Sequence, residues 1–383
     1  MNAYNQMKEA IRNILYQIYR LFPKHNHAVI WGWPPGEDNS RALIDRLQHK
    51  SVSQIILLVP EEAETKAAFR EPGNRVRVVL KDGWQCWLWF LTARYVFFTH
   101  RCLMRKFPDS VVSVNMWHGM PFKKIGALLA NDEGIRSRYV LATSDFWTPI
   151  MEQAMRPLGK VLTTGLPRND RLFSDRAAVR RKLGVQDRED VRRIVAWLPT
   201  YRKSVRGEIR EDGLESGSVF GIDDADPQAI NEFGRAHDML VWVKPHPMSP
   251  FEQIEEHSHL LIVGDAWLMR KNLSLYETLG ASDALISDIS SVAVDYLLLD
   301  RPIVHSFPDI EAYRHTRGFT VEPIEDYFMG PTTKTWEEAK RELKRILNGE
   351  DPGRENRQAM RELFHKHKDG QATRRLMDEL GIA

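Results

Sequence analysis

Two histidines of this 383-residue chain stand directly after apolar runs, beside residues that shape tight turns. His118 lies within residues 115–126, where Gly119 permits a close backbone approach and Pro121 suits the first turn of a helix. His246 lies between two prolines, which fix the backbone of a rigid turn. Because imidazole changes its protonation near neutral pH, either histidine could transfer a proton, although a purely structural hydrogen bond is the alternative.

Side chains that suit a phosphate or diphosphate accompany both histidines. Lysines follow His118 and precede His246, an arginine offers a planar fork of donors, and hydroxyls with an aspartate follow another apolar run. The candidate ligand-binding residues are Lys123, Lys124, Thr200, Arg202, Lys244, Ser287, Asp288, Ser290, Ser291 and Asp295. Ser290 and Ser291 open a predicted helix, whose free N–H groups favour anions. The alternative is that they only cap the helix, but a cap needs one serine, so the second serine favours a ligand site. The alternative is a solvated face for Lys123 and Lys124, a surface ion pair for Arg202, and a plain turn at the end of a strand for Lys244.

The elements that must position these residues are predicted to be short apolar strands alternating with helices. Runs such as 55–59 do not alternate in polarity, as expected for parallel strands buried on both faces. The predicted strands are 27–33, 54–59, 75–80, 95–99, 111–116, 140–143, 161–164, 194–198, 240–243, 260–263, 284–287 and 303–306. This order predicts an α/β fold of two doubly wound, Rossmann-like lobes with an active-site cleft between them. The polar clusters all follow strands, where such sheets bind ligands.

Charge and glycine content suggest where the chain divides. The charged stretch 175–193 precedes a new strand and separates the two lobes. We therefore expect an amphipathic helix at 1–26, an N-terminal lobe at 27–185, a C-terminal lobe at 186–350 and helices at 351–383 that pack back on the core. The segment 203–226 holds four glycines and many charges, which predicts a mobile loop, either an active-site flap or a surface insertion.

Composition narrows the class of protein. Lys plus Arg total 54 against 52 for Asp plus Glu, and this near balance argues against a nucleic-acid partner. The two cysteines lack redox or zinc spacing, no P-loop or glycine-rich dinucleotide fingerprint occurs, and no metal site is predicted. No cofactor is firmly indicated, although a divalent cation stays open. No run approaches the ~18 apolar residues that a membrane span needs, and no signal peptide is recognisable.

Two segments could lie on a membrane surface without crossing it. Residues 1–24 predict a helix with Met7, Ile11, Ile14, Leu15, Ile18 and Leu21 on one face and positive charge from Lys8, Arg12, Arg20 and Lys24. The alternative is a helix packed on the second lobe. The other segment joins Trp84, Trp87, Trp89 and Phe90 with Arg94, Arg101, Arg105 and Lys106. A buried helix and strand is the simpler interpretation of that segment.

Ten short blocks, taken in order and with their spacing, resemble a known family. They are residues 38–43, 117–119, 143–145, 164–170, 199–202, 244–247, 287–291, 301–303, 317–319 and 330–331. Between about residues 29 and 376, the chain resembles the CDP-glycerol glycerophosphotransferases, which include teichoic acid primases and polymerases and related capsule enzymes. It departs from the pattern at 120–122, where Met-Pro-Phe stands in place of the usual Thr-Pro-Leu, a difference that bears on acceptor fit.

The resemblance implies a GT-B-like fold in which the N-terminal lobe binds the acceptor and the C-terminal lobe binds the CDP-linked donor. It implies that His118 is the general base and that His246 contacts the donor diphosphate with Arg202, Ser290 and Ser291. Gly119 and Arg168 join Lys123 and Lys124 as acceptor or phosphate candidates. The implied reaction transfers glycerol phosphate from CDP-glycerol to a lipid-linked teichoic acid or capsule-type acceptor and releases CMP.

Several alternatives stay open at this point. The donor could be CDP-ribitol, and the enzyme could add one unit or many. A nucleotide-sugar glycosyltransferase of the same fold would release a nucleoside diphosphate instead of CMP. A non-catalytic membrane scaffold is a further alternative, against which the presence of both His118 and His246 argues. The expected partners are the CDP-alditol, a lipid-linked polymer and the membrane surface, and the expected location is peripheral, at the cytoplasmic face of the cell membrane.

Overall fold

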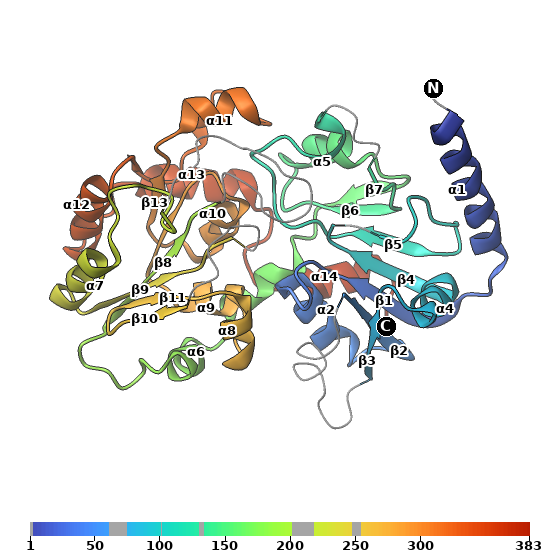
Figure 1. Cartoon of the computed structure of the whole chain (residues 1–383), viewed down its shortest axis with the longest axis horizontal. Coiled ribbons are helices and arrows are strands. Elements are labelled where there is room, and N and C mark those ends of the chain that lie inside the picture. The colour runs from blue at the N-terminus through green and yellow to red at the C-terminus, as the bar shows by residue number, and fades with distance from the viewer. Residues whose placement is uncertain (1–2, 61–74, 101, 130–133, 201–217, 247–253) are drawn as a thin grey trace. The chain divides into compact units, whose positions relative to one another are not determined.

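Two compact units make up the protein, each with its own seven-stranded sheet (Figure 1). The computed structural model describes residues 3–60, 75–100, 102–129, 134–200, 218–246 and 254–383. Unit 1 comprises Met1–His118, Gly126–Asp170 and Gln371–Ala383, and unit 2 comprises Gly119–Ile125 and Arg171–Gly370. The predicted α/β fold with two doubly wound lobes is confirmed.

The sheet of unit 1 is parallel throughout. Its strands lie in the order β3 (Val76–Leu80), β2 (Gln54–Val59), β1 (His25–Trp31), β4 (Ala93–Phe98), β5 (Val112–Asn115), β6 (Tyr139–Leu141) and β7 (Lys160–Leu162). The chain moves outward from β1 in one direction and then outward from β4 in the other. The order therefore reverses between β1 and β4, the point at which doubly wound sheets bind ligands.

The sheet of unit 2 repeats this winding. Its strands lie in the order β10 (Glu255–Glu256), β11 (Leu260–Ile262), β9 (Met239–Val243), β8 (Arg193–Leu198), β12 (Ala284–Ser287), β13 (Ile303–Ser306) and β14 (Thr332–Thr333). All neighbours pair in parallel except β10 with β11. Here the order reverses between β8 and β12. All twelve predicted strands are present, and among the described residues only the two-residue strands β10 and β14 escaped prediction.

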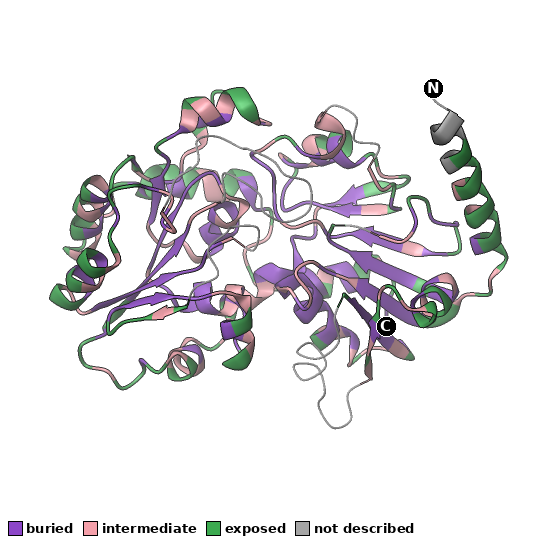
Figure 2. Cartoon of the chain, viewed as in Figure 1, coloured by how far each residue is buried: buried purple, intermediate pink, exposed green. Residues whose placement is uncertain are grey.

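Helices cover the strands, which Figure 2 shows as predominantly buried. In unit 1 they are α1 (Ala3–Leu21), α2 (Asp38–Leu47), α4 (Trp84–Thr92), α5 (Thr148–Met155) and α14 (Ala372–Glu379), with the 3-10 turn η1 (Gly126–Leu128). In unit 2 they are α6 (Arg176–Leu183), α7 (Pro227–Ala236), α8 (Asp265–Arg270), α9 (Leu275–Ala281), α10 (Ser291–Tyr296), α11 (Ile310–Thr316), α12 (Trp336–Leu347) and α13 (Arg354–Phe364), with η3 (Leu297–Leu299) and η4 (Ile324–Tyr327). The 3-10 stretch η2 (Pro167–Phe173) spans the change from unit 1 to unit 2.

The units divide the chain differently from the predicted boundaries. The last thirteen residues, Gln371–Ala383, belong to unit 1 because the Asp170 carboxylate accepts hydrogen bonds from the N–H groups of Ala372 (2.7 Å) and Thr373 (2.8 Å) at the start of α14. The helix α13, by contrast, belongs to unit 2. The predicted block 351–383 is therefore split, and the change from unit 1 to unit 2 comes at residue 171 rather than at 186.

The predicted loop 203–226 is only partly covered by the description, which resumes at residue 218. From there the chain packs into the core of unit 2. Phe220 and Ile222 are buried, and the ring of Phe220 lies 5.0 Å from the ring of Trp197. The expectation of a mobile loop is therefore wrong for residues 218–226, because apolar side chains fix them. The rest of that prediction, at 203–217, lies outside the described residues.

Candidate functional site

His118 stands in a strained turn beyond the carboxyl end of β5. Trp117, just before it, has φ of 54°, and Gly119, just after it, has φ of 121°. Positive φ costs glycine little, but it is unusual for a bulky aromatic residue and marks a position that its surroundings must hold. The N–H of Trp117 donates to Oδ1 of Asn115 at 3.0 Å, which closes the turn back onto the end of the strand. The backbone of this turn, rather than a flexible loop, therefore determines the position of His118.

The ring of His118 is half-buried among other aromatic rings. Its Nδ1 lies 3.5 Å from the carbonyl oxygen of Thr99, which favours the tautomer with the proton on Nδ1 and with Nε2 as the proton acceptor. The centroid of the Trp117 indole lies 4.0 Å from that of the imidazole, and His100 lies 5.1 Å away. His100 itself stacks on Trp117 and lies 5.9 Å from Trp33. Sequence reasoning missed His100 and Trp33, although both follow strands.

Of the four acceptor or phosphate candidates, Arg168 lies in unit 1. It is buried beyond β7, and its backbone N–H donates to Oδ1 of Asn39 at 3.1 Å. The structure thus brings the loops after β1, β5 and β7 to one edge of the sheet.

The remaining acceptor or phosphate candidates belong to unit 2, because the chain passes into that unit directly after His118. Lys124 is exposed, and its N–H donates to the Gly318 carbonyl. The Nζ of Lys123 lies 5.3 Å from the centre of the Tyr313 ring. Gly119 is buried. The roles that the resemblance implies for these three residues stay predictions.

In unit 2 the predicted donor-binding residues gather at the reversal point of the sheet. Thr200, after β8, donates its hydroxyl to the Asp288 carboxylate after β12, so one hydrogen bond joins the two loops that flank the reversal. The Ser287 hydroxyl donates to the Leu198 carbonyl at 2.9 Å. The buried Lys244 ammonium lies 3.0 Å from Asp265, a partner that sequence reasoning missed.

Burial governs the protonation of His246, which follows Lys244 at the end of β9. Desolvation lowers the pKa of His246 well below its usual range, and the positive charges of Lys123 and Lys244 lower it further. The Asp288 carboxylate acts in the opposite direction but does not overcome burial. At neutral pH the imidazole is therefore uncharged, and it can offer a ligand an N–H donor but no positive charge.

Several other predicted donor residues have structural roles. The hydroxyl of Ser290 accepts from the Val292 N–H at 3.4 Å and caps α10, which Ser291 opens. Asp295 is fully buried and accepts a 2.5 Å hydrogen bond from the Tyr276 hydroxyl. Their assignment to the donor stays a prediction, and so does that of Arg202, which lies outside the described residues, as do Arg101 and the Pro247 that follows His246.

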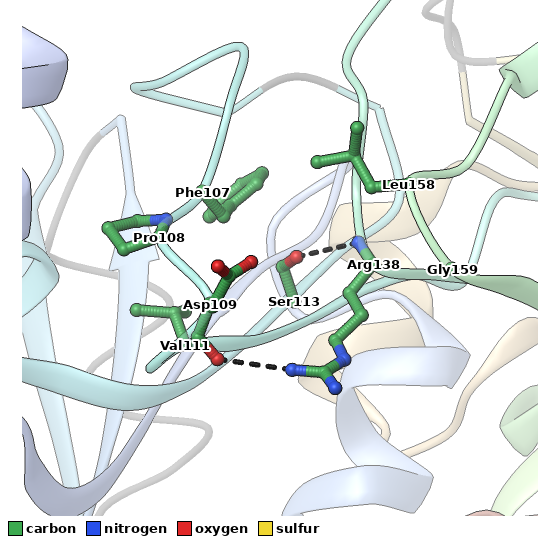
Figure 3. A pocket seen from close by; sticks show the side chains of 8 residues that line it. All are labelled: Phe107, Pro108, Asp109, Val111, Ser113, Arg138, Leu158 and Gly159. Atoms are coloured by element: carbon green, nitrogen blue, oxygen red, sulfur yellow. Dashed lines mark hydrogen bonds between the residues drawn. The ribbon is translucent and has the colours of Figure 1, made fainter.

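No cluster of three or more His, Cys, Asp or Glu side chains suited to a metal ion occurs within the part of the chain that the structure describes. A separate pocket lies at the opposite edge of the unit 1 sheet, at the amino ends of β5, β6 and β7 (Figure 3). Its lining includes Phe107, Asp109, Arg138 and Leu158, none of them a predicted site residue. The guanidinium of Arg138 donates to the Asp109 carbonyl at 3.1 Å. Because His118 and Arg168 follow the carboxyl ends of the strands, this pocket is distinct from the candidate site.

Comparison with known proteins gives a consistent result. The family model described as CDP-Glycerol:Poly(glycerophosphate) glycerophosphotransferase matches residues 16–381. The teichoic acid glycerol-phosphate transferase of Staphylococcus aureus (strain NCTC 8325 / PS 47) is 26% identical over 97% of this chain and 98% of that protein. A teichoic acid poly(glycerol phosphate) polymerase of Bacillus spizizenii is 24% identical over 98% of both proteins. A teichoic acid ribitol-phosphate primase of the same species is 26% identical over 70% of this chain and 68% of that protein.

The fold is also that of a solved structure. The wall teichoic acid polymerase TagF superposes with a TM-score of 0.72, at 18% identity, over 100% of this chain and 98% of that chain. At this identity the likeness concerns the fold alone. The family pattern, however, runs through both units and includes the turn of His118 and the strand ends of unit 2. The chain therefore belongs to the CDP-glycerol:poly(glycerophosphate) glycerophosphotransferase family of enzymes.

Proposed function

We propose that this enzyme transfers glycerol phosphate from CDP-glycerol to a lipid-linked teichoic acid or capsule-type acceptor and releases CMP, with His118 as the general base. The observation that carries the proposal is the turn of His118. A strained Trp117, a glycine and the Thr99 carbonyl fix an imidazole at the end of β5, with the tautomer that leaves Nε2 as the proton acceptor. A base held in this way suits abstraction of a proton from an alcohol.

The step balances without a further reactant. The acceptor hydroxyl gives its proton to Nε2 of His118 while its oxygen forms a bond to the β-phosphorus of CDP-glycerol. The bond from that phosphorus to the bridging oxygen breaks, and CMP leaves with the electron pair. Positioning and charge stabilisation supply most of the acceleration in phosphoryl transfer, and a general base contributes roughly 10²–10⁴-fold.

The donor is assigned to the polar residues at the strand ends of unit 2. Lys244, His246 and the hydrogen-bonded pair Thr200 and Asp288 come from three neighbouring strands. His246 offers an uncharged N–H donor, and Lys123 contributes positive charge close enough to affect the His246 pKa. The Lys244 ammonium and the His246 N–H suit the phosphates of a CDP-alditol, and the hydrogen bond from Thr200 to Asp288 holds together the loops beside them.

Glycerol is favoured over ribitol by the extent of the matches. The two glycerol-phosphate relatives named above align over 98% of their own length, whereas the ribitol-phosphate primase aligns over 68% of its length. A solved structure of a TagF variant was soaked with CDPG, which fits a CDP-linked donor for this fold. CDP-ribitol is therefore the second donor to test.

The experiment measures CMP released from CDP-glycerol and from CDP-ribitol, with and without a lipid-linked glycerol phosphate acceptor. Wild type is compared with His118→Ala and with His49→Ala, which removes an exposed histidine near the amino ends of the same sheet. We expect acceptor-dependent CMP release from CDP-glycerol that falls roughly 10²–10⁴-fold in His118→Ala and stays unchanged in His49→Ala. Near-normal turnover by His118→Ala would refute the base assignment. Release of UDP from a nucleotide sugar instead of CMP would make the protein a glycosyltransferase.

We also propose that the enzyme works as a peripheral protein at the cytoplasmic face of the cell membrane. No helix among the described residues is long and apolar enough to cross a bilayer. The helix α1 instead exposes one apolar face, and Figure 2 shows most of this helix as exposed. Its exposed apolar side chains are Met7, Ile11, Ile14, Leu15, Ile18 and Leu21.

The structure indicates how α1 is fixed to unit 1. Tyr19 is fully buried and lies 5.5 Å from Phe90 and 6.5 Å from Phe107. Lys24, predicted to meet the membrane, instead donates to the carbonyls of Tyr19 and Leu91. The helix is thus anchored by its C-terminal end, and the expectation that Lys24 supplies membrane-facing charge is wrong. The side chain of Lys8 lies outside the described part of the chain.

Exposed basic side chains near Phe107 complete the proposed membrane surface. They are Arg105, Lys106, Arg136 and Arg138, at or beside the amino ends of β5 and β6. An apolar helix face next to such charges suits an anionic bilayer. Trp84 and Leu88 on α4 are also exposed, whereas Phe90 is buried and belongs to the core.

The membrane proposal is tested by flotation with vesicles of phosphatidylglycerol and phosphatidylcholine. Ile11→Glu with Ile14→Glu places two charges on the apolar face of α1, and Asn13→Glu with Gln17→Glu places the same charges on its polar face. We expect the first pair to abolish flotation and the second to weaken it only slightly, because only the first disrupts apolar burial. Equal flotation of both variants with wild type would remove α1 from this role.

A further inference from the structure

The strained Trp117 beside His118 is held by two side-chain amides. Its N–H donates to Asn115 Oδ1 at 3.0 Å, and its carbonyl oxygen accepts from Nδ2 of Asn39 at 3.2 Å. Asn115 is the last residue of β5 and thus a neighbour in sequence, but Asn39 is 78 residues away. Left-handed backbone is unfavourable for a residue with a side chain, so these bonds oppose relaxation of the turn.

Asn39 also fixes a third strand end. It is fully buried, and its Oδ1 accepts from the N–H of Arg168, beyond β7, at 3.1 Å. One amide group therefore joins the start of α2, the turn of His118 and the loop of Arg168. The orientation of the amide follows from its partners, because a carbonyl requires the NH₂ side and an N–H group requires the oxygen.

The helix start that carries Asn39 is itself held firmly. The carboxylate of Glu37 accepts from the N–H groups of Asn39 (2.8 Å) and Ser40 (2.7 Å) and caps α2. Gly32, the residue after β1, leaves room for this cap, because a Cβ there would collide with Oγ of Ser40 and lie 2.7 Å from Oε1 of Glu37. The donor to Trp117 is therefore placed by a capped helix rather than by a free loop.

From this geometry we infer that Asn39 is a positioning residue, which holds the turn of His118 in its reactive orientation and ties it to the loop of Arg168. The inference rests on the proposed function in one respect, namely that His118 is the base. Without the Asn39 amide, the Trp117 carbonyl loses its long-range partner, and the turn can relax toward ordinary backbone angles. The His118 ring then moves away from the acceptor hydroxyl. A misplacement of about 1 Å lowers turnover by roughly 10²-fold.

The test is a double-substitution cycle on acceptor-dependent CMP release. Asn39→Ala removes both hydrogen bonds. Asn39→Asp keeps the size and the acceptor for Arg168 but replaces the donor to Trp117 with an oxygen. We expect both to lower kcat by roughly 10²-fold with KM for CDP-glycerol nearly unchanged. In the His118→Ala background the same substitutions should lower kcat by less than about 2-fold, since there is no base left to misplace.

Thr92→Val is the matched control. It removes a hydrogen bond from a buried hydroxyl to the Leu88 carbonyl (2.7 Å) at the amino end of β4, in the same unit. Its kcat should stay within about 2-fold of wild type, even if its melting temperature falls as much as that of the Asn39 variants. If Asn39→Ala does not fold, Asn39→Asp carries the test, because it keeps the volume and the bond to Arg168.

The outcomes separate this inference from the proposed function. Losses of equal size with and without His118 would show that Asn39 acts independently of the base, and kcat near that of wild type in both Asn39 variants would overturn the inference directly. In both of these cases His118→Ala is still inactive, so the base assignment survives. If His118→Ala turns over normally, the base assignment fails first, and the positioning role fails with it.

Discussion

Acidification should destabilise unit 2 through His305, a fully buried residue of β13. The Nε2 atom of His305 accepts from the N–H of Met329 at 3.0 Å, so its Nδ1 must carry the proton and donate to the Asp288 carbonyl at 3.2 Å. A second proton on Nε2 would face the Met329 N–H and remove an acceptor. Burial lowers the pKa of His305 to about 4.

The sign and size of the effect follow from the two pKa values. In the unfolded chain a histidine titrates near 6.5, so between pH 6.5 and 4 the unfolded state binds more protons than the native state. The stabilisation contributed by uncharged His305 is therefore fully present above pH 6.5 and is lost as the pH falls toward 4. For this one group the loss relative to pH 8 amounts to about 2 kcal/mol at pH 5 and about 3 kcal/mol at pH 4.

Urea unfolding of wild type and His305→Gln at pH 8, 6 and 5 measures this effect. The difference at pH 8 reports the hydrogen bonds that glutamine fails to reproduce, and the change of that difference with pH reports the titration. Burial also lowers the pKa of His27 and His365, so the variant keeps part of the acid sensitivity. We expect wild type to lose about 2 kcal/mol more than the variant between pH 8 and pH 5.

If the free energy of unfolding changed with pH in the same way for wild type and His305→Gln, the reasoning would be refuted. It would mean that His305 has the same pKa in the folded and the unfolded chain. Thr92→Val, which removes no ionisable group, serves as the control and should keep the wild-type slope. The effect bears on function because Asp288, whose carbonyl His305 binds, receives the Thr200 hydroxyl at the reversal point of the sheet.

Two further substitutions test other parts of the structure. Trp117→Ala should be about 1–2 kcal/mol less stable than Trp117→Gly, because both lose the indole but only alanine resists a φ of 54°; equal urea midpoints would contradict the strained turn. Arg357→Ala should lower the free energy of unfolding by about 3–5 kcal/mol, because the buried guanidinium binds Asp351 and Asp300. Arg345→Ala, which breaks exposed ion pairs with Glu342 and Glu350, should leave the urea midpoint nearly unchanged, because solvent screens exposed charges.

The sheets could be predicted from the sequence because parallel strands buried on both faces have a local signature. The run at 54–59 is apolar without alternation, and it forms β2 with every residue from Ile55 onward buried. The strand β10 has no such signature. It consists of Glu255 and Glu256 at the sheet edge and exists only through its pairing with β11.

The sequence allowed us to predict which strand ends carry the candidate site, but not which residues contact one another there. His118, Thr200 and Lys244 stand after apolar runs that can be recognised along the chain. Their contacts are made by residues far away, since Asn39 reaches Trp117 across 78 positions and Thr200 meets Asp288 across 88. No local pattern encodes such a pairing, and the same holds for Asp170, which caps α14 from 202 residues away and moves the end of the chain into unit 1.

The charge of the predicted donor-binding residues differs from what their residue types suggest. From the sequence, Lys244 and His246 are two cationic groups in adjacent positions. In the structure Asp265 lies 3.0 Å from the Lys244 ammonium, and burial with two neighbouring lysines keeps His246 uncharged. Unpaired cations so close together would destabilise the fold, and both the Asp265 partner and the uncharged state of His246 reduce that destabilisation.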